Sequence, residues 1–324
     1  MILSLKKETY RIPSNTILSL ILILVDKQTD PSQSWRMIRS QKPIPKHSRY
    51  QLFTLAISIA LVVSPLLSQT KERIVSVHGT ITEILYALNL NPLLVAVDST
   101  SSIPKDSAPL PVVGYQRTLT TEGILSFKPT ILVGLETAGP AQTIQNLKDT
   151  GIKVSLFPDE YKLETPIDRV LAVGKLFGKN AEAEKLAGQI RTQIQSLQLK
   201  KTNVKVLFLY SRNPSSIFIS GVGTAAHAMI TLSGAKNAVT EFSEYKPLTS
   251  EALVKANPDI ILMPETSAEG FGGTKAIWSI NGIELTRAGK EKNIILVDDL
   301  LLLGFGPRLP QVLKTLNDKW KQTE

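Results

Sequence analysis

The stretch Gly114–Val133, GYQRTLTTEGILSFKPTILV, decides the fold, because the second half of the chain repeats much of it. Leu119–Val133 reads LTTEGILSFKPTILV, and Leu248–Leu262 reads LTSEALVKANPDIIL. Both copies have Leu-Thr, a Glu two residues after the Thr, an apolar pair, a Pro and an apolar run. Solenoid repeats are shorter, roughly 20–50 residues, so the pattern predicts two similar α/β lobes. The alternative is that helix–Pro–strand segments are common in α/β proteins.

Each copy predicts a short surface helix followed by a strand. Thr120 and Thr249 are placed to cap the two helices. Glu122 and Glu251 would sit in the first turn, where the helix dipole favours a carboxylate. The proline of each copy cannot continue a helix, so the chain leaves the helix there and enters a strand.

Length, charge and cysteine content exclude several classes of function. A length of 324 residues suggests about two domains, and a hydrophobic fraction of 43% is ample for their cores. Most of the net charge of +9 comes from residues 1–71, so the rest of the chain gives no electrostatic case for binding nucleic acid. The absence of cysteine excludes disulfides, thiolate metal sites, a cysteine nucleophile and an acylated cysteine.

Residues 1–71 are interpreted as an N-terminal extension with an export signal. Arg49–Ser68 resembles a secretory signal, with basic residues before the apolar run Leu52–Leu67. That run is shorter than the roughly 20 residues of a spanning helix; the alternative is an uncleaved membrane anchor. Met37 would begin a conventional signal peptide, so we hypothesise that translation starts there rather than at Met1.

The remainder alternates strands and helices, which predicts parallel sheets. We expect an N-terminal lobe over 72–164, bridging helices over 165–202 and a C-terminal lobe over 203–324. Within the bridge, Glu182–Leu199 is predicted to be a long, stiff helix joining the lobes. Further expectations are a helix over Ile81–Leu88 capped by Thr80, a turn over Phe271–Gly273, a loop over Leu300–Gly306 and a terminal helix over Pro310–Trp320.

Motifs of common enzyme classes are missing. The sequence has no Walker phosphate loop and no Gly-x-Ser-x-Gly elbow, and Gly221-Val222-Gly223 lacks the third glycine of a dinucleotide fingerprint. His78 and His227 are the only histidines after the signal, which argues against a metal site built on several histidines. His227, early in a predicted helix, is interpreted as an ordinary surface residue.

Tyr115 and Arg117 are the first candidate site residues. They lie in a Gly-Tyr-Gln-Arg turn after a Pro-rich loop, where side chains can project toward a ligand. A cation beside a phenol favours the phenolate and could also bind an anionic ligand. The alternatives are that Tyr115 packs on the protein surface and that Arg117 is an ordinary surface charge.

His78 and Arg308 complete the candidate set. His78 ends the first predicted strand, where open α/β sheets usually bind ligands; otherwise it is a turn histidine bonded to backbone. Arg308, in Gly-Phe-Gly-Pro-Arg, begins the terminal helix and could be structural only.

From Arg73 to about Trp320 the chain resembles haem-binding periplasmic proteins of bacterial haemin ABC importers. These belong to the class of substrate-binding proteins with a helical backbone, together with the cobalamin and siderophore binders. The segments that carry the resemblance are RIVSVHGTITEILYALNL, VAVDSTS, VVGYQRTLTTEGILSFKPTILV, GTAAHAMITLSGAKNAV, YKPLTSEALVKANPDIILM and LLLLGFGPR. The Val-Gly-Tyr-x-Arg-x-Leu and Leu-Leu-Gly-Phe-Gly-Pro-Arg segments point to the haem branch.

The resemblance implies an α/β fold of two Rossmann-like lobes joined by a long helix, the class III periplasmic binding protein fold, with the ligand between the lobes. Tyr115 matches the family's axial iron ligand, and a phenolate oxygen suits ferric iron. Arg117 matches an arginine near the haem, where it would pair with the phenolate or a propionate. Glu122 and Glu251 match the two acidic residues that dock such proteins on the permease.

One position departs from the family. Residue 78 is usually glycine in the haem members, and the histidine here would supply a second iron ligand, touch a propionate or do neither. Ligands from the second lobe cannot be assigned; Tyr210 and Arg212 lie in a suitable loop but match nothing firmly.

The resemblance therefore implies an exported, monomeric carrier, not an enzyme, that delivers ferric haem to an ABC permease dimer with its ATPase. A ferric-siderophore or cobalamin binder is the alternative within the class. An α/β enzyme with a metallocluster or nucleotide is the alternative outside it.

Overall fold

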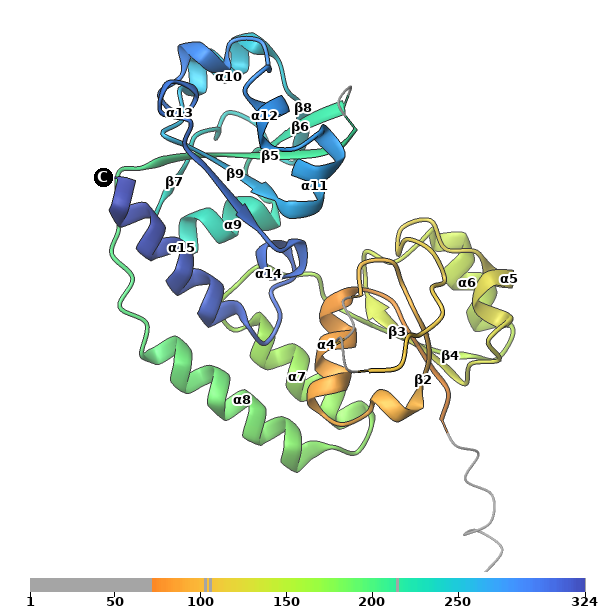
Figure 1. Cartoon of the computed structure of the whole chain (residues 1–324). Coiled ribbons are helices and arrows are strands. Elements are labelled where there is room, and N and C mark those ends of the chain that lie inside the picture. The colour runs from red at the N-terminus through yellow and green to blue at the C-terminus, as the bar shows by residue number, and fades with distance from the viewer. Residues whose placement is uncertain (1–71, 102–103, 105–106, 214–215, 324) are drawn as a thin grey trace, which may run out of the picture. The chain divides into compact units, whose positions relative to one another are not determined.

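Short apolar runs after residue 72 form a four-stranded parallel sheet in the order β2-β1-β3-β4 (Figure 1). The computed structural model describes residues 72–101, 104, 107–213 and 216–323. The predicted signal, anchor and start site all lie outside these residues. The strands are β1 (Ile74–Ser76), β2 (Leu94–Val97), β3 (Ile131–Leu135) and β4 (Lys153–Phe157).

Helices cover both faces of this sheet because its strands are apolar on both sides. Successive residues point to opposite faces of a strand, and Ile74 and Val75 accordingly enter two separate hydrophobic clusters. One face carries α4 (Gly79–Ala87) and the bridging helices, and the other carries α5 (Thr121–Leu125) and α6 (Ala141–Asp149). A 3₁₀ turn, η2 (Asn91–Leu93), precedes β2.

The second sheet is mixed, in the order β10-β9-β5-β6-β8, with β7 also paired to β5. Its strands are β5 (Lys205–Asn213), β6 (Ser216–Ser220), β7 (Lys236–Asn237), β8 (Tyr245–Pro247), β9 (Ile260–Pro264) and β10 (Ile294–Val297). The prediction of parallel sheets is right for β10, β9, β5 and β7 and wrong for β6 and β8, which pair antiparallel. The connection from β5 to β6 is a hairpin, which is too short for a parallel crossover.

Helices also cover both faces of the second sheet. Phe208 on β5 points into a cluster with α9 (Ala225–Leu232), α14 (Asp299–Leu303) and α15 (Leu309–Thr323). Its neighbour Leu209 points into the opposite cluster. That face carries α10 (Ser250–Ala256), α11 (Glu265–Phe271), α12 (Thr274–Ile277), η3 (Ile283–Leu285) and α13 (Arg287–Glu291).

The sequence repeat is a structural repeat. Thr120 and Thr249 cap α5 and α10. Each threonine hydroxyl accepts a hydrogen bond from the backbone N–H three residues later, at 3.2 Å in α5 and 3.1 Å in α10. The residue before each proline, Lys128 or Asn257, is left-handed, with φ of 48° and 39°. This conformation ends the helix and turns the chain into β3 or β9. The two predicted N-caps are thus confirmed.

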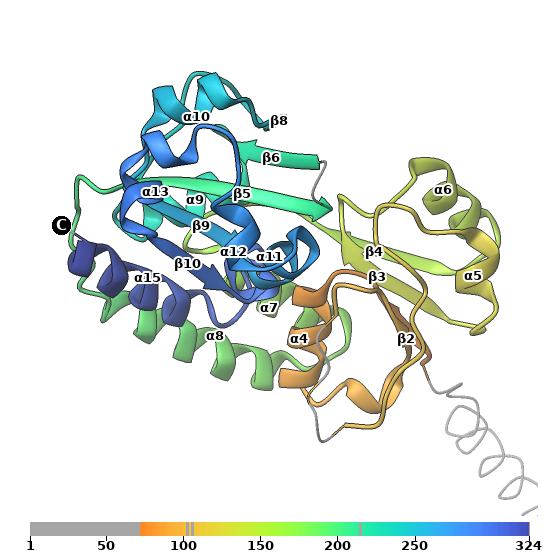
Figure 2. The same ribbon diagram turned by 45° about the horizontal axis from the view of Figure 1, so that its top comes forward.

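The bridge consists of two helices, α7 (Thr165–Leu176) and α8 (Asn180–Gln195), which pack on each other and on the first lobe. The two helices are separated by a short break, in which Gly178 has φ 67°. The expected helix over Glu182–Leu199 is shorter, because it ends at Gln195. In Figures 1 and 2, α8 runs beside α15 of the second lobe, which it contacts.

Three local predictions are wrong. His78, not Thr80, caps α4, because the chain turns into the helix earlier than expected. Leu300–Gly306 is not all loop, since Asp298 caps α14 by accepting from the Leu301 N–H at 2.9 Å. Phe271 ends α11 rather than beginning a turn. The terminal helix is confirmed as α15.

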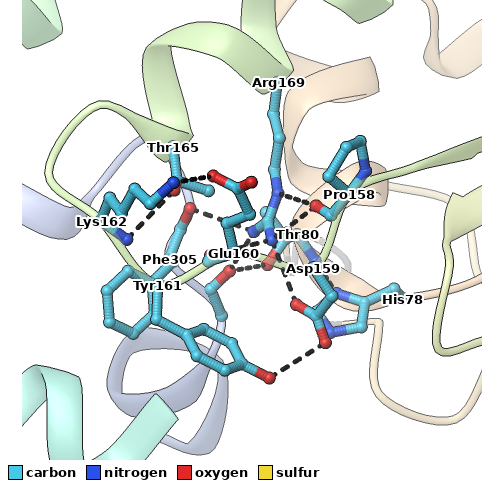
Figure 3. A network of polar contacts seen from close by, with 11 residues as sticks. His78, Thr80, Pro158, Asp159, Glu160, Tyr161, Lys162, Thr165, Arg169 and Phe305 are labelled. Atoms are coloured by element: carbon cyan, nitrogen blue, oxygen red, sulfur yellow. Dashed lines mark hydrogen bonds and ion pairs between the residues drawn. The ribbon is translucent and has the colours of Figure 1, made fainter. Parts of the chain in front are cut away.

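Arg169 of α7 joins the two lobes (Figure 3). Its side chain is 3% exposed. It donates to the carbonyls of Gly304 and Phe305 in the second lobe at 2.9 and 3.3 Å. It also donates to the carbonyls of Pro158 and Glu160, and pairs with the Asp159 carboxylate at 3.1 Å. One guanidinium thereby satisfies carbonyls from both lobes.

Two further contacts cross the same junction. The buried Thr80 hydroxyl donates to the Gly304 carbonyl at 2.8 Å. A Cβ at residue 304 would lie 2.6 Å from that hydroxyl oxygen, so only glycine permits the approach. Arg308 pairs with Glu83 of α4 at 2.6 Å.

We predict that Arg169→Met destabilises the protein by about 3–5 kcal/mol, because it leaves several carbonyls without a donor and the largely buried Asp159 carboxylate without its counter-charge. Urea unfolding followed by circular dichroism measures the loss. Arg191→Met, at an exposed position of α8, is the matched control and should change stability by less than about 0.5 kcal/mol. Equal effects of the two substitutions would contradict the role given to Arg169.

Candidate functional site

The turn Gly114–Arg117 is held at the carboxyl edge of the first sheet. The N–H of Ser99, which follows β2, donates to the first carbonyl of the turn at 2.9 Å. The N–H of Gly139, which follows β3, donates to the carbonyl of Gln116 at 2.9 Å. The turn is thus fastened to the ends of two strands, at the edge where open α/β sheets bind ligands.

Both candidate side chains of this turn are accessible to a ligand. Tyr115 is half-buried and Arg117 is exposed. The charge of Arg117 acts on the pKa of His78 and Tyr161 in its own lobe, and on that of Tyr245 in the second lobe. Arg117 therefore lies where the two lobes face each other.

His78 occupies a backbone conformation that suits glycine, with φ at 94°. Its side chain compensates by capping α4, since Nδ1 accepts from the Thr80 N–H at 3.3 Å. Its own N–H donates to Asp98 at 3.0 Å. Burial lowers the pKa of His78 to about 4, with the Asp159 charge opposing that shift. The ring is consequently neutral at pH 7, and its Nδ1 is occupied by the helix cap.

Asp98 organises the loop behind His78. The carboxylate is 1% exposed, yet all its contacts are hydrogen bonds. One oxygen accepts from the His78 N–H and the Ser101 hydroxyl, and the other accepts from the N–H and hydroxyl of Thr100. This network fixes the start of α4 at the carboxyl end of β1.

Tyr161 follows β4 and lies at the same sheet edge. Its hydroxyl donates to the Asp159 oxygen at 3.1 Å, and its ring packs against Phe305 of the second lobe, with centroids 5.3 Å apart (Figure 3). Burial and the Asp159 charge raise the pKa of Tyr161 well above its usual range. The phenol therefore stays protonated as a donor to the partner of Arg169.

Tyr245 on β8 is the facing aromatic residue of the second lobe. It is 39% exposed, and its ring lies against Phe208 at 6.2 Å between centroids. Burial of the phenol raises the pKa of Tyr245 to about 12, opposed by hydrogen bonds from Thr224 and the Ala226 N–H at the start of α9. The hydroxyl thus points into the helix terminus while part of the ring remains uncovered.

The other candidates are placed differently. Arg308 is exposed but engaged in its ion pair with Glu83 between the lobes. His227 on α9 is half-buried, and its Nδ1 lies 3.2 Å from the amide nitrogen of Asn237 on β7. It is therefore not the ordinary surface residue that we expected. Tyr210, on β5, is half-buried at the edge of the core below α9. For Arg212 only the backbone, in β5, is described.

Two open hollows lie elsewhere, in the second lobe. One of about 380 Å³ is lined by polar residues of the β10 edge and the end of α15, and a smaller apolar one of about 120 Å³ adjoins it. Neither touches a candidate site residue. The candidate site is therefore defined by the side chains at the facing edges of the two lobes.

Two features are absent from the described residues. Within these ranges no group of three or more His, Cys, Asp or Glu side chains could hold a metal ion. In the same part of the chain, no helix is both long and apolar enough to cross a membrane.

Sequence reasoning missed Tyr161, Asp159 and Tyr245. The first two directly follow an apolar run and a proline in FPDEY, which marks them as residues at a strand end. Tyr245 lies three residues before the second copy of the repeat, and nothing local distinguishes it. Its position becomes meaningful only when the second sheet brings β8 beside α9.

Comparison with known proteins connects this geometry to a family. The model of a family described as periplasmic binding protein matches residues 74–300. Among solved structures, the chain is similar to the periplasmic haem-binding protein RhuT from Roseiflexus sp. RS-1 in its apo form. The identity is 35%, the TM-score is 0.73, and the match covers 78% of this chain and 99% of that one.

Curated relatives are more distant. An uncharacterized ABC transporter substrate-binding lipoprotein, YvrC of Bacillus subtilis, is 26% identical over 85% of this chain and 88% of its own length. A vitamin B12-binding protein of Vibrio campbellii is 22% identical over 67% and 83%.

We predict that His78 makes stability depend on pH. Its folded pKa of about 4 lies below the ordinary 6.5, so the unfolded chain binds more protons between these values. The free energy of unfolding therefore falls as pH drops from about 6.5 to 4, by about 2 kcal/mol from this residue. His78→Gly, which suits φ 94°, should lack that part of the fall.

The measurement is urea unfolding of both proteins at several pH values across this range. Since carboxylates titrate in both, the difference between the two curves isolates His78. Parallel curves would show that the ring is accessible to protons in the folded state.

Proposed function

Because this chain belongs to the periplasmic binding protein family, and so to substrate-binding proteins rather than enzymes, we propose that it captures ferric haem between its lobes for an ABC importer. The observation that carries the proposal is the turn with Tyr115 and Arg117, fastened to a sheet edge opposite Tyr245 of the second lobe. The similarity to a haem-binding protein at 35% identity supports the same ligand.

Tyr115 is the proposed iron ligand. A phenolate is a hard, anionic oxygen donor, which suits ferric iron. The described residues contain no cluster of histidines and carboxylates that would compete for the metal. His78 has its Nδ1 committed to the helix cap, so in this proposal it shapes the sheet edge beside the ligand rather than binding iron through that nitrogen.

Arg117 is the proposed partner of a haem propionate or of the phenolate. It is exposed and lies within electrostatic reach of side chains from both lobes. A guanidinium can bind a carboxylate through two parallel hydrogen bonds. Arg308 is held by Glu83, and a propionate would have to compete with that carboxylate for it.

Glu122 and Glu251 are the proposed docking residues for the permease. Both are exposed in the first turn of their helices, α5 and α10, and each helix occupies the same place in its copy of the repeat. A feature made twice, once per lobe, suits a permease dimer with two-fold symmetry. The similarity to an ABC transporter substrate-binding protein supports a permease and its ATPase as partners.

Export follows from this role, with the predicted signal in residues 49–68 directing the chain to the periplasm. The curated relative is a lipoprotein, whereas this sequence has no cysteine to acylate. An uncleaved signal would hold the protein at the membrane through the apolar run 52–67.

Cobalamin is the second candidate ligand, because vitamin B12-binding proteins are among the relatives. Cobalamin binding would not require Tyr115. The two ligands are therefore separated by substitution at that residue as well as by direct titration.

We predict that Tyr115→Phe weakens haemin binding on the order of 100-fold, since direct loss of a ligand should exceed the 10–100-fold typical of outer partners. A haemin titration of the wild type followed by Soret absorbance should saturate with a tyrosinate-ligated ferric spectrum that the variant lacks. Tyr86→Phe, on α4, is the control and should bind normally.

Two results would refute parts of this proposal. Haemin binding that survives Tyr115→Phe would move the iron ligand to another residue. Saturable cobalamin binding without haemin binding would replace the ligand altogether.

We also predict that Glu122→Lys with Glu251→Lys weakens docking on the permease but leaves haem binding unchanged. Placing two positive charges against a basic permease surface should weaken the complex at least about tenfold. The readout is haem-stimulated ATPase activity of the reconstituted transporter. Glu184→Lys, exposed on α8, is the control, and its loss of stimulation to the same degree would rule out specific docking.

A further inference from the structure

Tyrosines gather at the facing edges of the two sheets. The described part of the chain contains five: Tyr86, Tyr115, Tyr161, Tyr210 and Tyr245. Tyr86 lies in the last turn of α4, partly buried against the core of the first lobe and away from the sheet edge. Tyr115 and Tyr161 follow strands of the first sheet, Tyr245 begins β8 of the second sheet, and Tyr210 lies within β5. With aromatic residues only 6% of the sequence, this grouping calls for an explanation.

Tyr161 and Tyr245 lie near each other, since the charge of Tyr245 acts on the pKa of Tyr161. Tyr161 lies 5.3 Å from Phe305 and Tyr245 lies 6.2 Å from Phe208, both in tilted geometry. Phe305 and Phe208 are fully buried members of the same hydrophobic cluster of the second lobe. The two buried phenylalanines thus support the two partly exposed tyrosines from behind.

The hydroxyls of both tyrosines are turned into the protein. That of Tyr161 donates to Asp159, and that of Tyr245 is hydrogen-bonded at the start of α9. The pKa of each phenol is raised by burial, so neither is a phenolate at neutral pH. What these residues can offer a ligand is therefore ring surface rather than an anionic oxygen for a metal.

Arg117 completes the recognition chemistry. Its charge acts on both tyrosines, so it lies within electrostatic range of the surface that they form. A planar aromatic ligand with peripheral carboxylates matches this combination: its face stacks on the rings and its carboxylates meet the guanidinium. A hydroxamate or catecholate iron chelate has no extended flat face that could stack on the tyrosine rings.

We propose that Tyr161 and Tyr245 hold the porphyrin plane independently of the iron, so that the protein also binds iron-free porphyrin. This proposal rests on the proposed haem function. It assigns recognition of the metal and recognition of the porphyrin to different residues of the same site. Tyr115 recognises the metal, and the Tyr161–Tyr245 surface together with Arg117 recognises the dicarboxylic tetrapyrrole.

The test titrates the full-length protein and its variants with protoporphyrin IX, which has no iron, and in parallel with haemin. The wild type is expected to bind both ligands. Tyr115→Phe should lose haemin while keeping protoporphyrin IX within about twofold of the wild type. Tyr161→Leu and Tyr245→Leu should each weaken both ligands by about tenfold, the loss of one aromatic contact and its buried area.

Conservative variants guard against misfolding. Tyr161→Phe and Tyr245→Phe keep the rings, so both should bind protoporphyrin IX nearly as well as the wild type. Circular dichroism and melting temperature are measured for each Leu variant. If the Phe variants lose porphyrin as fully as the Leu variants, the hydroxyls rather than the ring faces carry the contact and the proposal fails.

The outcomes separate this inference from the proposed function. Haemin binding without protoporphyrin IX binding by the wild type overturns the inference and leaves the function standing. Protoporphyrin IX binding without haemin binding supports the inference and refutes ferric haem as the cargo. Unchanged binding of both ligands by folded Leu variants overturns the inference alone.

Discussion

The guanidinium of Arg169 is the constraint on which the arrangement of the lobes depends. It is buried, and its partners include carbonyls of both lobes and one carboxylate. A buried charge with this many directional partners tolerates little displacement, because each lost partner leaves a desolvated polar group. The Asp159 that balances it also accepts from Tyr161, so the position of a candidate ligand-contacting ring follows from the same charge. Stiffness between the lobes and the geometry of the site therefore share one cause.

The candidate site is formed by residues that follow the ends of several strands. His78, Tyr115 and Tyr161 follow β1, β2 and β4, and the loop of Phe305 follows β10 and α14. Parallel strands bring their carboxyl ends to one edge, which explains how residues far apart in the sequence converge. The second sheet adds Tyr245 by a different route, because β8 joins it through the antiparallel strand β6.

His78 shows how a locally unfavourable residue is accommodated. Its φ of 94° would suit glycine, yet the ring caps α4 and the backbone N–H is held by Asp98. Strain of this kind, on the order of 1–3 kcal/mol, persists when surrounding contacts determine the conformation. The histidine consequently acts as part of the scaffold at the sheet edge, and its neutrality at pH 7 follows from burial there.

The sequence predicted the two α/β lobes, the helical bridge and the paired caps Thr120 and Thr249, because these depend on local periodicity, capping residues and prolines. It also placed Tyr115 and Arg117 in a turn. It could not predict the antiparallel β6 and β8, the capping of α4 by His78 or the helix α14, since pairing partners and left-handed residues depend on contacts distant in the chain. Only the tertiary structure brought Tyr161 and Tyr245 to the facing edges and directed Arg308 to Glu83. Those positions are decided by sheet order and by the burial of Arg169, which no local pattern encodes.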